Sequence, residues 1–297
     1  MRLVIIANPV AGGGRAYKQI QSYVRRWPHA RWEVKILATR SRDEAGLLAQ
    51  KLTRDPPDLL AICGGDGTLN EVASRIPNPP FPIALLPAGT ANVVARELGI
   101  PLNPISALEI GLKRAVRRLD LGNLGAGTRR FLFVAGIGFD AYVVAKVHPG
   151  LKKKLGMAAY AAAIISCIRS YSFPEFQVAI EGRTYTATSC LACNAKSYGG
   201  GMLFCPEADM SDGLLDVLVL EGDRRLGLAR FLFQAWRGKT ESHDWVHRLR
   251  ARSLQIEGDA AVLAQADGEL AGGLPLKIGL ANAAFPLVIP PEAGVLG

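Results

Sequence analysis

A carboxylate flanked by glycines is the part of this sequence with the clearest capacity for chemistry. The run from Cys63 to Val72 reads CGGDGTLNEV and follows apolar residues that begin at Leu59. Glycines let backbone N–H groups approach a ligand, and a helix start adds unpaired N–H groups that attract an anion. Asp66 would repel a bare phosphate, so a bridging cation is its natural partner. Phosphate, Mg²⁺ and a carboxylate together indicate phosphoryl transfer.

The same run also has a purely structural interpretation, as a tight turn from a strand into a helix without a ligand. Thr68 and Glu71 have the spacing of a capping box, and Leu69 and Val72 belong to one apolar helix face. Taken alone, the run supports both interpretations about equally. Asp66 has no obvious capping role, and this makes the motif more specific than a glycine-rich turn.

A second candidate for chemistry stands near the end of the chain, where the sequence reads Asp267-Gly268-Glu269. A primary alcohol is a poor nucleophile at neutral pH, and a positioned carboxylate that accepts its proton contributes about 10²–10⁴-fold. Asp-Gly is also a strong signal for a hairpin turn. Without the other motifs, the turn is the favoured interpretation.

The elements that must position these residues differ between the two halves of the chain. In the first half, short apolar runs alternate with helical patterns, which is typical of a parallel sheet. Three of the loops that follow these runs contain Gly with Asn or Thr, and ligands bind at that edge of such sheets. This convergence favours a phosphate-binding site over the structural interpretation. The predicted strands are Leu3–Ala7, Trp32–Leu37, Leu59–Cys63 and Pro82–Leu86.

The second half is rich in β-type runs separated by Gly-containing turns, which predicts a mainly antiparallel β-sandwich. We therefore expect an α/β domain over residues 1–122, which segment 285–297 could rejoin, and a β-sandwich domain over residues 123–284. Two helices are expected within the second domain, at Lys152–Ser170 and Leu226–Trp236. The predicted strands are Arg130–Ile137, Phe176–Ile180, Thr184–Asn194, Leu214–Leu220, Ser253–Glu257, Ala261–Ala266 and Leu274–Ile278.

Charge and hydropathy restrict the partners. The net charge of +9 favours acidic partners, but the basic residues are scattered, so nucleic acid is not expected. The longest apolar stretch, Met157 to Ile168, is shorter than the roughly 20 residues that span a bilayer. No secretory signal is apparent. We expect a cytoplasmic protein that can associate peripherally with a membrane.

Six motifs in order along the whole chain resemble the bacterial diacylglycerol-kinase-like lipid kinases, relatives of the sphingosine and ceramide kinases. The Gly-Gly-Asp-Gly-Thr loop alone would also admit the NAD kinases and phosphofructokinases. The motifs are Asn8-Pro9 with Gly12–Gly14, then Gly64–Glu71, Leu86–Asn92, Asn194–Met202, Pro206–Val217 and Asp267–Glu269.

The resemblance implies an ATP- and Mg²⁺-dependent transfer of the γ-phosphoryl group to a lipid hydroxyl, in a cleft between the two domains. Asp66 would act on the ATP phosphates through metal or water, Asp267 would be the general base, and Glu269 would support it. The residues implied in nucleotide binding are Asn8, Gly12, Thr39, Gly64, Gly65, Asp66, Gly67, Thr68, Leu69, Asn70, Glu71, Gly89, Thr90 and Asn92.

A structural Mg²⁺ is also implied by the resemblance, bound by the Asp212 carboxylate and the backbone carbonyls of Asp209 and Leu214. The sequence departs from the family pattern at two positions. Val93 follows Asn92 where the family often has Asp, and Ala11 stands where Ser is common. Both departures bear on nucleotide affinity.

The lipid itself is not identified by the sequence. Diacylglycerol is the first choice on the basis of the resemblance, which would give phosphatidic acid and a role in phospholipid biosynthesis. Other lipid alcohols (a sphingoid base, ceramide, phosphatidylglycerol), a soluble acceptor as in NAD kinase, and a nucleotide-gated lipid-binding regulatory protein stay open. Lys152–Lys154 could aid docking to an anionic membrane. A homodimer also stays open.

Overall fold

The computed structural model describes residues 1–125, 129–146, 162–198, 201–239 and 241–291. The chain divides into two compact units. The N-terminal unit comprises Met1–Leu121 together with the segment from Asn282, and the C-terminal unit comprises Gly122–Ala281. Two strands pass from one unit to the other: β5 (Val116–Leu124) and β18 (Leu276–Val288).

The N-terminal unit is built on a parallel sheet with strand order β2-β1-β3-β4, and β18 pairs in parallel with β4 at Leu287 and Ile83. The strands β3 and β4 are buried along their whole length, as expected where both faces of a parallel sheet are covered. The four strands are β1 (Arg2–Ala7), β2 (Glu33–Ala38), β3 (Leu59–Gly64) and β4 (Ile83–Pro87).

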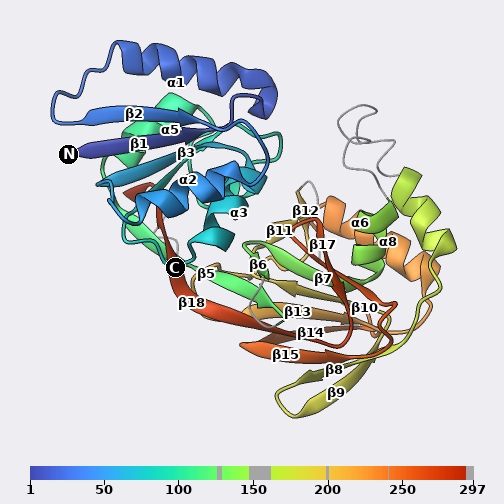
Figure 1. The fold of residues 1–297 in the computed structure, drawn as a ribbon. Helices are drawn as coiled ribbons and strands as arrows, with labels where there is room; N and C mark the ends of the chain where they lie inside the picture. The colour runs from blue at the N-terminus through green and yellow to red at the C-terminus, as the bar shows by residue number, and fades with distance from the viewer. Residues whose placement is uncertain (126–128, 147–161, 199–200, 240, 292–297) are drawn as a thin grey trace. The chain divides into compact units, whose positions relative to one another are not determined.

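Helices cover this sheet on both faces, with α1 and α5 on one side and α2 and α3 on the other (Figure 1). The carboxyl ends of the strands are in register, because Ala7 is the partner of both Ala38 and Cys63. The helical elements are η1 (Ala11–Gly14), α1 (Arg15–Arg25), α2 (Glu44–Leu52), α3 (Asp66–Arg75), α4 (Val93–Glu97) and α5 (Pro104–Gly111).

The C-terminal unit is an antiparallel β-sandwich. One sheet has the strand order β14-β13-β10-β7-β16-β17, and the other contains β18-β15-β8-β9 with β5 and β6. Apolar side chains of both sheets form one buried cluster, which includes Phe176, Ile256 and Val217. The strands are β6 (Arg129–Phe131), β7 (Val134–Gly138), β8 (Phe176–Ile180), β9 (Arg183–Ala187), β10 (Ser189–Cys193), β13 (Leu215–Leu220), β14 (Val246–Ala251), β15 (Ser253–Glu257), β16 (Leu263–Ala266) and β17 (Glu269–Gly273), with a small pair of β11 (Ser197–Tyr198) and β12 (Met202–Leu203).

Helices α6 (Phe139–Lys146) and α8 (Arg225–Trp236) belong to the C-terminal unit, together with a helical segment over residues 162–170. The first part of the predicted helix Lys152–Ser170, and with it Lys152–Lys154, lies outside the described residues. Across the described part of the chain, none of the helices combines the length and apolar character needed to cross a membrane.

Three sequence predictions of single elements were wrong. The predicted strand Arg130–Ile137 is divided between β6 and β7, which belong to different sheets. The predicted strand Thr184–Asn194 is divided between β9 and β10, which belong to different sheets, and buried Thr188 at the break bonds to the carbonyls of Leu220 and Gly222. Thr68 and Glu71 do not form a capping box, because α3 already begins at Asp66 with Gly65 as its N-cap. A capping box needs the hydroxyl residue at the N-cap itself.

Candidate active site

Three loops of the N-terminal unit leave the same edge of its parallel sheet. The backbone N–H of Asn8 donates to the carbonyl of Cys63 at 2.9 Å, and the N–H of Ala88 donates to the carbonyl of Gly64 at 2.9 Å. These bonds hold the loop after β1 against β3, and the loop after β4 against β3. The predicted convergence of the loops is therefore found within this unit.

Glycines let the three loops touch backbone to backbone. A Cβ atom on Gly12 would lie 2.3 Å from the Ala88 carbonyl oxygen, and one on Gly65 would lie 3.0 Å from the Gly89 Cα. Gly13 and Gly67, in contrast, have no atom within 4 Å of the position of a Cβ. The loops thus contact one another through one set of glycines and present another set to open space, where the phosphates of a nucleotide could approach the backbone.

Asp66 holds two of these loops together. Its carboxylate accepts the N–H of Val93 at 3.1 Å and the N–H of Val94 at 3.3 Å, which are the first N–H groups of α4. Burial raises the pKa of Asp66, and these backbone hydrogen bonds act in the opposite direction. Asp66 therefore has the capping role that the sequence did not indicate. It caps α4, which is remote in sequence, so local spacing gave no sign of it.

The residues after Asp66 have mainly internal partners. Thr68 is buried against Gly64, and Leu69 lies in the core. Glu71 accepts backbone hydrogen bonds at the start of α2, and burial raises its pKa. Asn70 contacts Ser74 through their side chains at 3.4 Å. In this run, Gly67 therefore offers its backbone to a ligand, while the larger side chains stabilise the fold around it.

The other predicted nucleotide residues lie at the ends of neighbouring strands. The Asn8 side chain accepts the N–H of Val10 at 3.1 Å, which shapes its loop. Thr39 is buried directly after β2, and its N–H donates to the carbonyl of Ala7 at 2.8 Å. Asn92 is buried and bonds through its side chain to both backbone groups of Gly89, at 2.8 Å and 3.0 Å. Thr90 is exposed in the same loop.

Asp267 occupies a tight turn between β16 and β17 in the C-terminal unit. Both Asp267 and Gly268 have positive φ, at 49° and 86°, as in a two-residue type I′ hairpin. The interpretation of Asp267-Gly268 as a hairpin turn and its interpretation as a functional site are therefore compatible, because the turn directs the Asp267 carboxylate at a row of backbone N–H groups. It accepts the N–H groups of Leu132, Phe133 and Val134 at 2.7, 3.0 and 3.0 Å.

The donor segment is itself held in place by Asn194. The buried Asn194 side chain donates to the carbonyl of Leu132 at 2.9 Å, and its backbone N–H donates to the carbonyl of Phe133 at 2.8 Å. Glu269 forms an ion pair with Arg129 at 2.5 Å. In this structure Glu269 therefore faces Arg129, and Asp267 is positioned by backbone groups.

A buried relay that the sequence interpretation missed fixes the other side of the turn. The Gln265 side chain, 0% exposed, accepts the Gly268 N–H at 2.7 Å and donates to the Asp140 carboxylate at 2.5 Å. Because the carboxylate can only accept, it orients the amide so that its oxygen faces Gly268. Burial raises the pKa of Asp140 to about 6, against the opposing effect of the Gln265 hydrogen bond. Asp140 is a lone carboxylate within the apolar run after Gly138, and this was the sequence signal from which it could have been identified.

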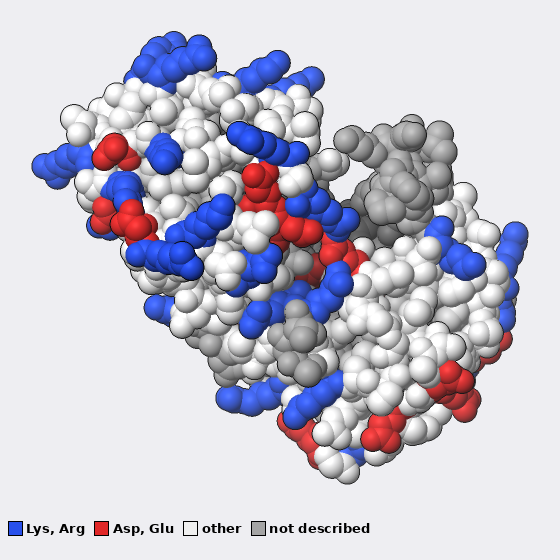
Figure 2. Space-filling view, in the orientation of Figure 1, with Lys and Arg blue, Asp and Glu red and all other residues white. Residues whose placement is uncertain are grey.

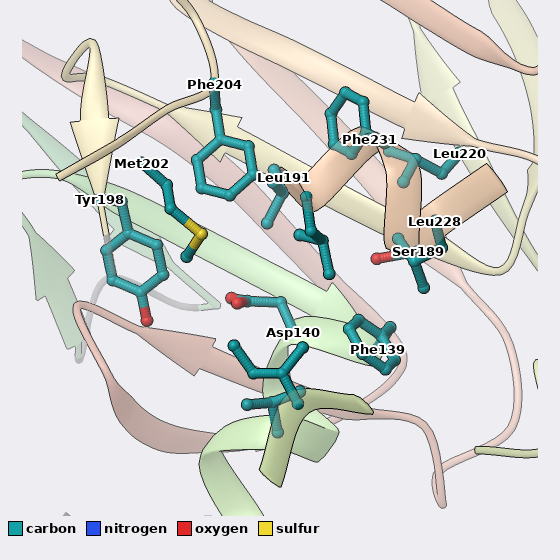
Figure 3. A pocket seen from close by; sticks show the side chains of 13 residues that line it. Phe139, Asp140, Ser189, Leu191, Tyr198, Met202, Phe204, Leu220, Leu228 and Phe231 are labelled. Atoms are coloured by element: carbon teal, nitrogen blue, oxygen red, sulfur yellow. The ribbon is translucent and has the colours of Figure 1, made fainter. Parts of the chain in front are cut away.

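Asp140 also lines an apolar pocket in this unit. The Asp140 carboxylate points toward Tyr198 and Met202, and α8 contributes Leu228 and Phe231 from the other side (Figure 3). The Tyr198 hydroxyl lies 3.8 Å from the position of a Cβ on Gly268, so the pocket adjoins the Asp267 turn. The pocket is lined by Phe139, Asp140, Val143, Ile164, Ser189, Leu191, Tyr198, Met202, Phe204, Leu220, Leu228, Phe231 and Leu232.

The predicted metal loop holds its carboxylates in internal contacts. Asp209 accepts both the N–H and the hydroxyl of Ser211, and Asp212 accepts the N–H of Leu214 at 2.9 Å. The second oxygen of Asp212 is bound by the Arg250 guanidinium. Among the described residues, no three His, Cys, Asp or Glu side chains gather as a metal site. Arg250 supplies a positive charge at the place where the resemblance implies Mg²⁺.

Comparisons with known proteins agree with this geometry. Residues 2–124 match the family model of the diacylglycerol kinase catalytic domain, and residues 134–290 match that of the YegS C-terminal NAD kinase beta sandwich-like domain. A Mycobacterium tuberculosis protein named diacylglycerol kinase is 31% identical over 97% of this chain and 95% of its own length. A Pseudomonas fluorescens protein named "probable lipid kinase YegS-like" is 30% identical over 94% of this chain and 93% of its own.

A solved structure has the same fold. The crystal structure of a "putative diacylglycerol kinase" from Bacillus anthracis str. Sterne superimposes with a TM-score of 0.79 at 25% identity, over 98% of this chain and 96% of that one. The two family models and these relatives define the class of the chain as a kinase. The chain belongs to the diacylglycerol-kinase-like lipid kinase family, and it is a lipid kinase.

Proposed function

We propose that this lipid kinase transfers the γ-phosphoryl group of ATP, with Mg²⁺, to the hydroxyl group of diacylglycerol and so produces phosphatidic acid. The observation that carries the proposal is the fixed position of the Asp267 carboxylate beside an apolar pocket. The apolar lining of the pocket suits an acyl chain, and the carboxylate is proposed to accept a proton from the hydroxyl at its mouth. A base of this kind contributes about 10²–10⁴-fold to the rate.

The nucleotide is proposed to bind at the three glycine loops of the N-terminal unit. The residues present fit phosphates, because Gly13 and Gly67 leave their backbone accessible and the start of α3 offers N–H groups. Mg²⁺, when bound, would neutralise phosphate charge. Asp66 would contact it through water, since each of its oxygens already accepts a backbone N–H and retains a lone pair. Lysine and arginine side chains are spread over the visible surface (Figure 2), and this charge favours an anionic substrate.

The Asp267 carboxylate is proposed as the general base of the reaction. Three backbone N–H groups orient the carboxylate, which would hold it in place for proton transfer from the lipid hydroxyl. Glu269, paired with Arg129, is proposed to keep local charge balanced near the base. The Asp140–Gln265 relay holds the turn from beneath, so Asp140 and Gln265 are proposed as positioning residues.

Two alternatives differ in the acceptor. Another lipid alcohol would use the same pocket and base, so the geometry does not separate it from diacylglycerol. A soluble acceptor, as in NAD kinase, would have no use for a pocket whose lining is almost entirely apolar. A non-catalytic lipid-binding protein would not require a carboxylate fixed by three donors.

The proposal is tested by incubating the purified protein with Mg²⁺, γ-labelled ATP and a panel of lipid alcohols in mixed micelles, beside Asp267→Asn. Label should enter diacylglycerol with the wild type and be nearly absent with the variant. Label in a different lipid would correct the substrate. Label in no lipid, with ATP binding intact, would count against the function.

A structural Mg²⁺ at the Asp212 loop is kept as a separate proposal, since its carbonyl groups suit a hard cation. Metal content is measured in the wild type, in Asp212→Ala and in Arg250→Gln. If Mg²⁺ uses the Asp212 carboxylate, Arg250→Gln should retain or gain metal and Asp212→Ala should lose it. Equal metal content in all three would end the proposal.

A further inference from the structure

The two faces of helix α8 are both apolar, which is unusual for a helix at the surface of a protein. The inner face contributes Leu228, Phe231 and Leu232 to the apolar pocket. The outer face exposes Leu226 (89%), Phe233 (56%) and Trp236 (54%). These three are among the most exposed large apolar residues of the described chain, and they lie on a single element.

Basic residues accompany the exposed apolar ones. Arg230 and Arg237 have three- or four-residue spacing to Leu226 and Phe233, which places all four on one helical face. The Arg237 guanidinium lies 6.0 Å from the centre of the Phe233 ring, and the Phe233 and Trp236 rings are 5.9 Å apart. Exposed Arg224 and Lys239 flank the helix. Arg230 has an acidic partner, Glu241, at 3.1 Å.

The orientation of α8 is fixed at its first residue. The Arg225 guanidinium donates to the carbonyls of Ile168, Arg169 and Tyr171 at 2.8, 2.7 and 3.0 Å. These carbonyls belong to the end of the helical segment 162–170 and the residue that follows it. The helix therefore cannot rotate to bury Leu226 without losing these bonds, and the exposure of its outer face is built into the fold.

We propose that the outer face of α8 is a docking surface for an anionic lipid bilayer. Leucine, phenylalanine and tryptophan beside arginine and lysine are the residues of a helix that lies in the membrane interface. The basic residues that flank the helix complement the charge of anionic headgroups. Binding to a neutral apolar protein surface would not require these basic residues. The choice of a bilayer as the occupant rests on the proposed function, because the inner face of the same helix lines the pocket for the lipid. Docking through α8 places the pocket beside the bilayer.

The test measures vesicle binding in the absence of ATP. The wild type is sedimented with vesicles of phosphatidylcholine alone and of phosphatidylcholine mixed with phosphatidylserine, at low and high salt. The triple variant Leu226→Gln/Phe233→Gln/Trp236→Gln should bind at least about tenfold more weakly. The control Leu47→Gln/Leu102→Gln/Val116→Gln removes three exposed apolar residues from the N-terminal unit, each less exposed than those of α8, and should bind like the wild type.

Charge and fluorescence give two further readouts. Arg224→Gln and Arg237→Gln should each weaken binding to the anionic vesicles about fivefold, whereas Arg25→Gln and Arg26→Gln on α1 should not. The emission of the wild type should shift to the blue on addition of anionic vesicles, and Trp236→Phe should abolish most of the shift while it retains binding. Trp236 is the exposed member of the four tryptophans.

Three outcomes would overturn the proposal: no binding of the wild type to any vesicle, equal binding of the triple variant, or a dimer that sedimentation velocity detects and the triple variant dissociates. The last would assign the face to a second copy of the chain. In mixed micelles, lipid phosphorylation by the triple variant should equal that of the wild type. A wild type that binds vesicles but phosphorylates no lipid would count against the function and leave the docking surface in place.

Discussion

The Asp66 carboxylate accepts the backbone N–H of Val93 at 3.1 Å, and this bond connects the Gly-Gly-Asp-Gly-Thr loop to the loop after β4. The donor is backbone, so the contact does not depend on the side chain at position 93. Val93 is one of the two positions at which the sequence departs from the family pattern, and this departure leaves the connection in place. Asp66 therefore links two of the loops proposed to bind the nucleotide.

Gly67 offers a direct test of the nucleotide site. Nothing lies within 4 Å of the position of its Cβ, so Gly67→Ala should fold normally and could gain up to about 1 kcal/mol of helix stability. Its affinity for a non-hydrolysable ATP analogue should fall by about tenfold, because the methyl group would obstruct the approach of phosphate to the backbone. Calorimetry measures the affinity. Gly12→Ala is the contrasting variant, since its Cβ would meet the Ala88 carbonyl at 2.3 Å and should destabilise the unit.

Asp267→Asn should separate the chemical role of Asp267 from its role in the turn. Asparagine tolerates a positive φ, and its Oδ1 can still accept the N–H groups of Phe133 and Val134. Its NH2 group would face the Leu132 N–H, which also donates, so the melting temperature should fall moderately. The kcat for lipid phosphorylation should fall by about 10²–10⁴-fold because the proton acceptor is lost. The KM values for both substrates should stay near those of the wild type. A variant with wild-type kcat would show that Asp267 only builds the hairpin.

Gln265→Glu should disrupt the relay beneath the turn. The new carboxylate would replace a donor that lies 2.5 Å from the Asp140 oxygen, so two negative charges would face each other. The repulsion should displace the turn that carries Asp267, and a misplaced reacting group lowers the rate, so we expect kcat to fall by about 10²-fold. The loss should be larger at higher pH, where both carboxylates are ionised.

The double variant Asp140→Asn/Gln265→Glu is the matched control for the relay. It exchanges donor and acceptor, so the Asn side chain donates to the new carboxylate, which still accepts the Gly268 N–H. Most of the activity should return. Equal losses in the single and the double variant would show that these residues act only through packing.

The stability of the C-terminal unit should depend on the titration of Asp140. Burial raises the pKa of Asp140 from 3.8 to about 6, so the folded state binds this proton more tightly than the unfolded state does. The free energy of unfolding should therefore fall as the pH rises from about 4 to about 6. In the Asp140→Asn variant, the free energy of unfolding should lack this part of its decline with pH. Urea unfolding at several pH values compares the two proteins, and parallel curves would contradict the assignment.

The strands β3 and β4 of the N-terminal unit were accessible to sequence reasoning because each is a short apolar run bounded by glycine or proline, as Leu59 to Cys63 illustrates. The sandwich was harder to divide into strands. The sequence predicts one helix over Asn103–Arg117, but α5 ends at Gly111 and β5 begins at Val116. The strand β14 is partly exposed and contains no long apolar run. The glycine loops and Asp267 could be identified from motifs. Asp140 and Gln265 could not, since Asp140 meets Gln265 only through the pairing of β7 with β16, which are far apart in the sequence.

The strand β18 has a consequence for the synthesis of this protein on the ribosome. Its last residues pair in parallel with β4 at Ile83, so the N-terminal unit obtains an outer strand of its sheet from residues that are translated after the whole sandwich. Until then the edge of β4 presents unpaired backbone groups that invite pairing with other chains. The nascent N-terminal unit is therefore incomplete for most of translation, and a chaperone that shields β4 would act in this interval.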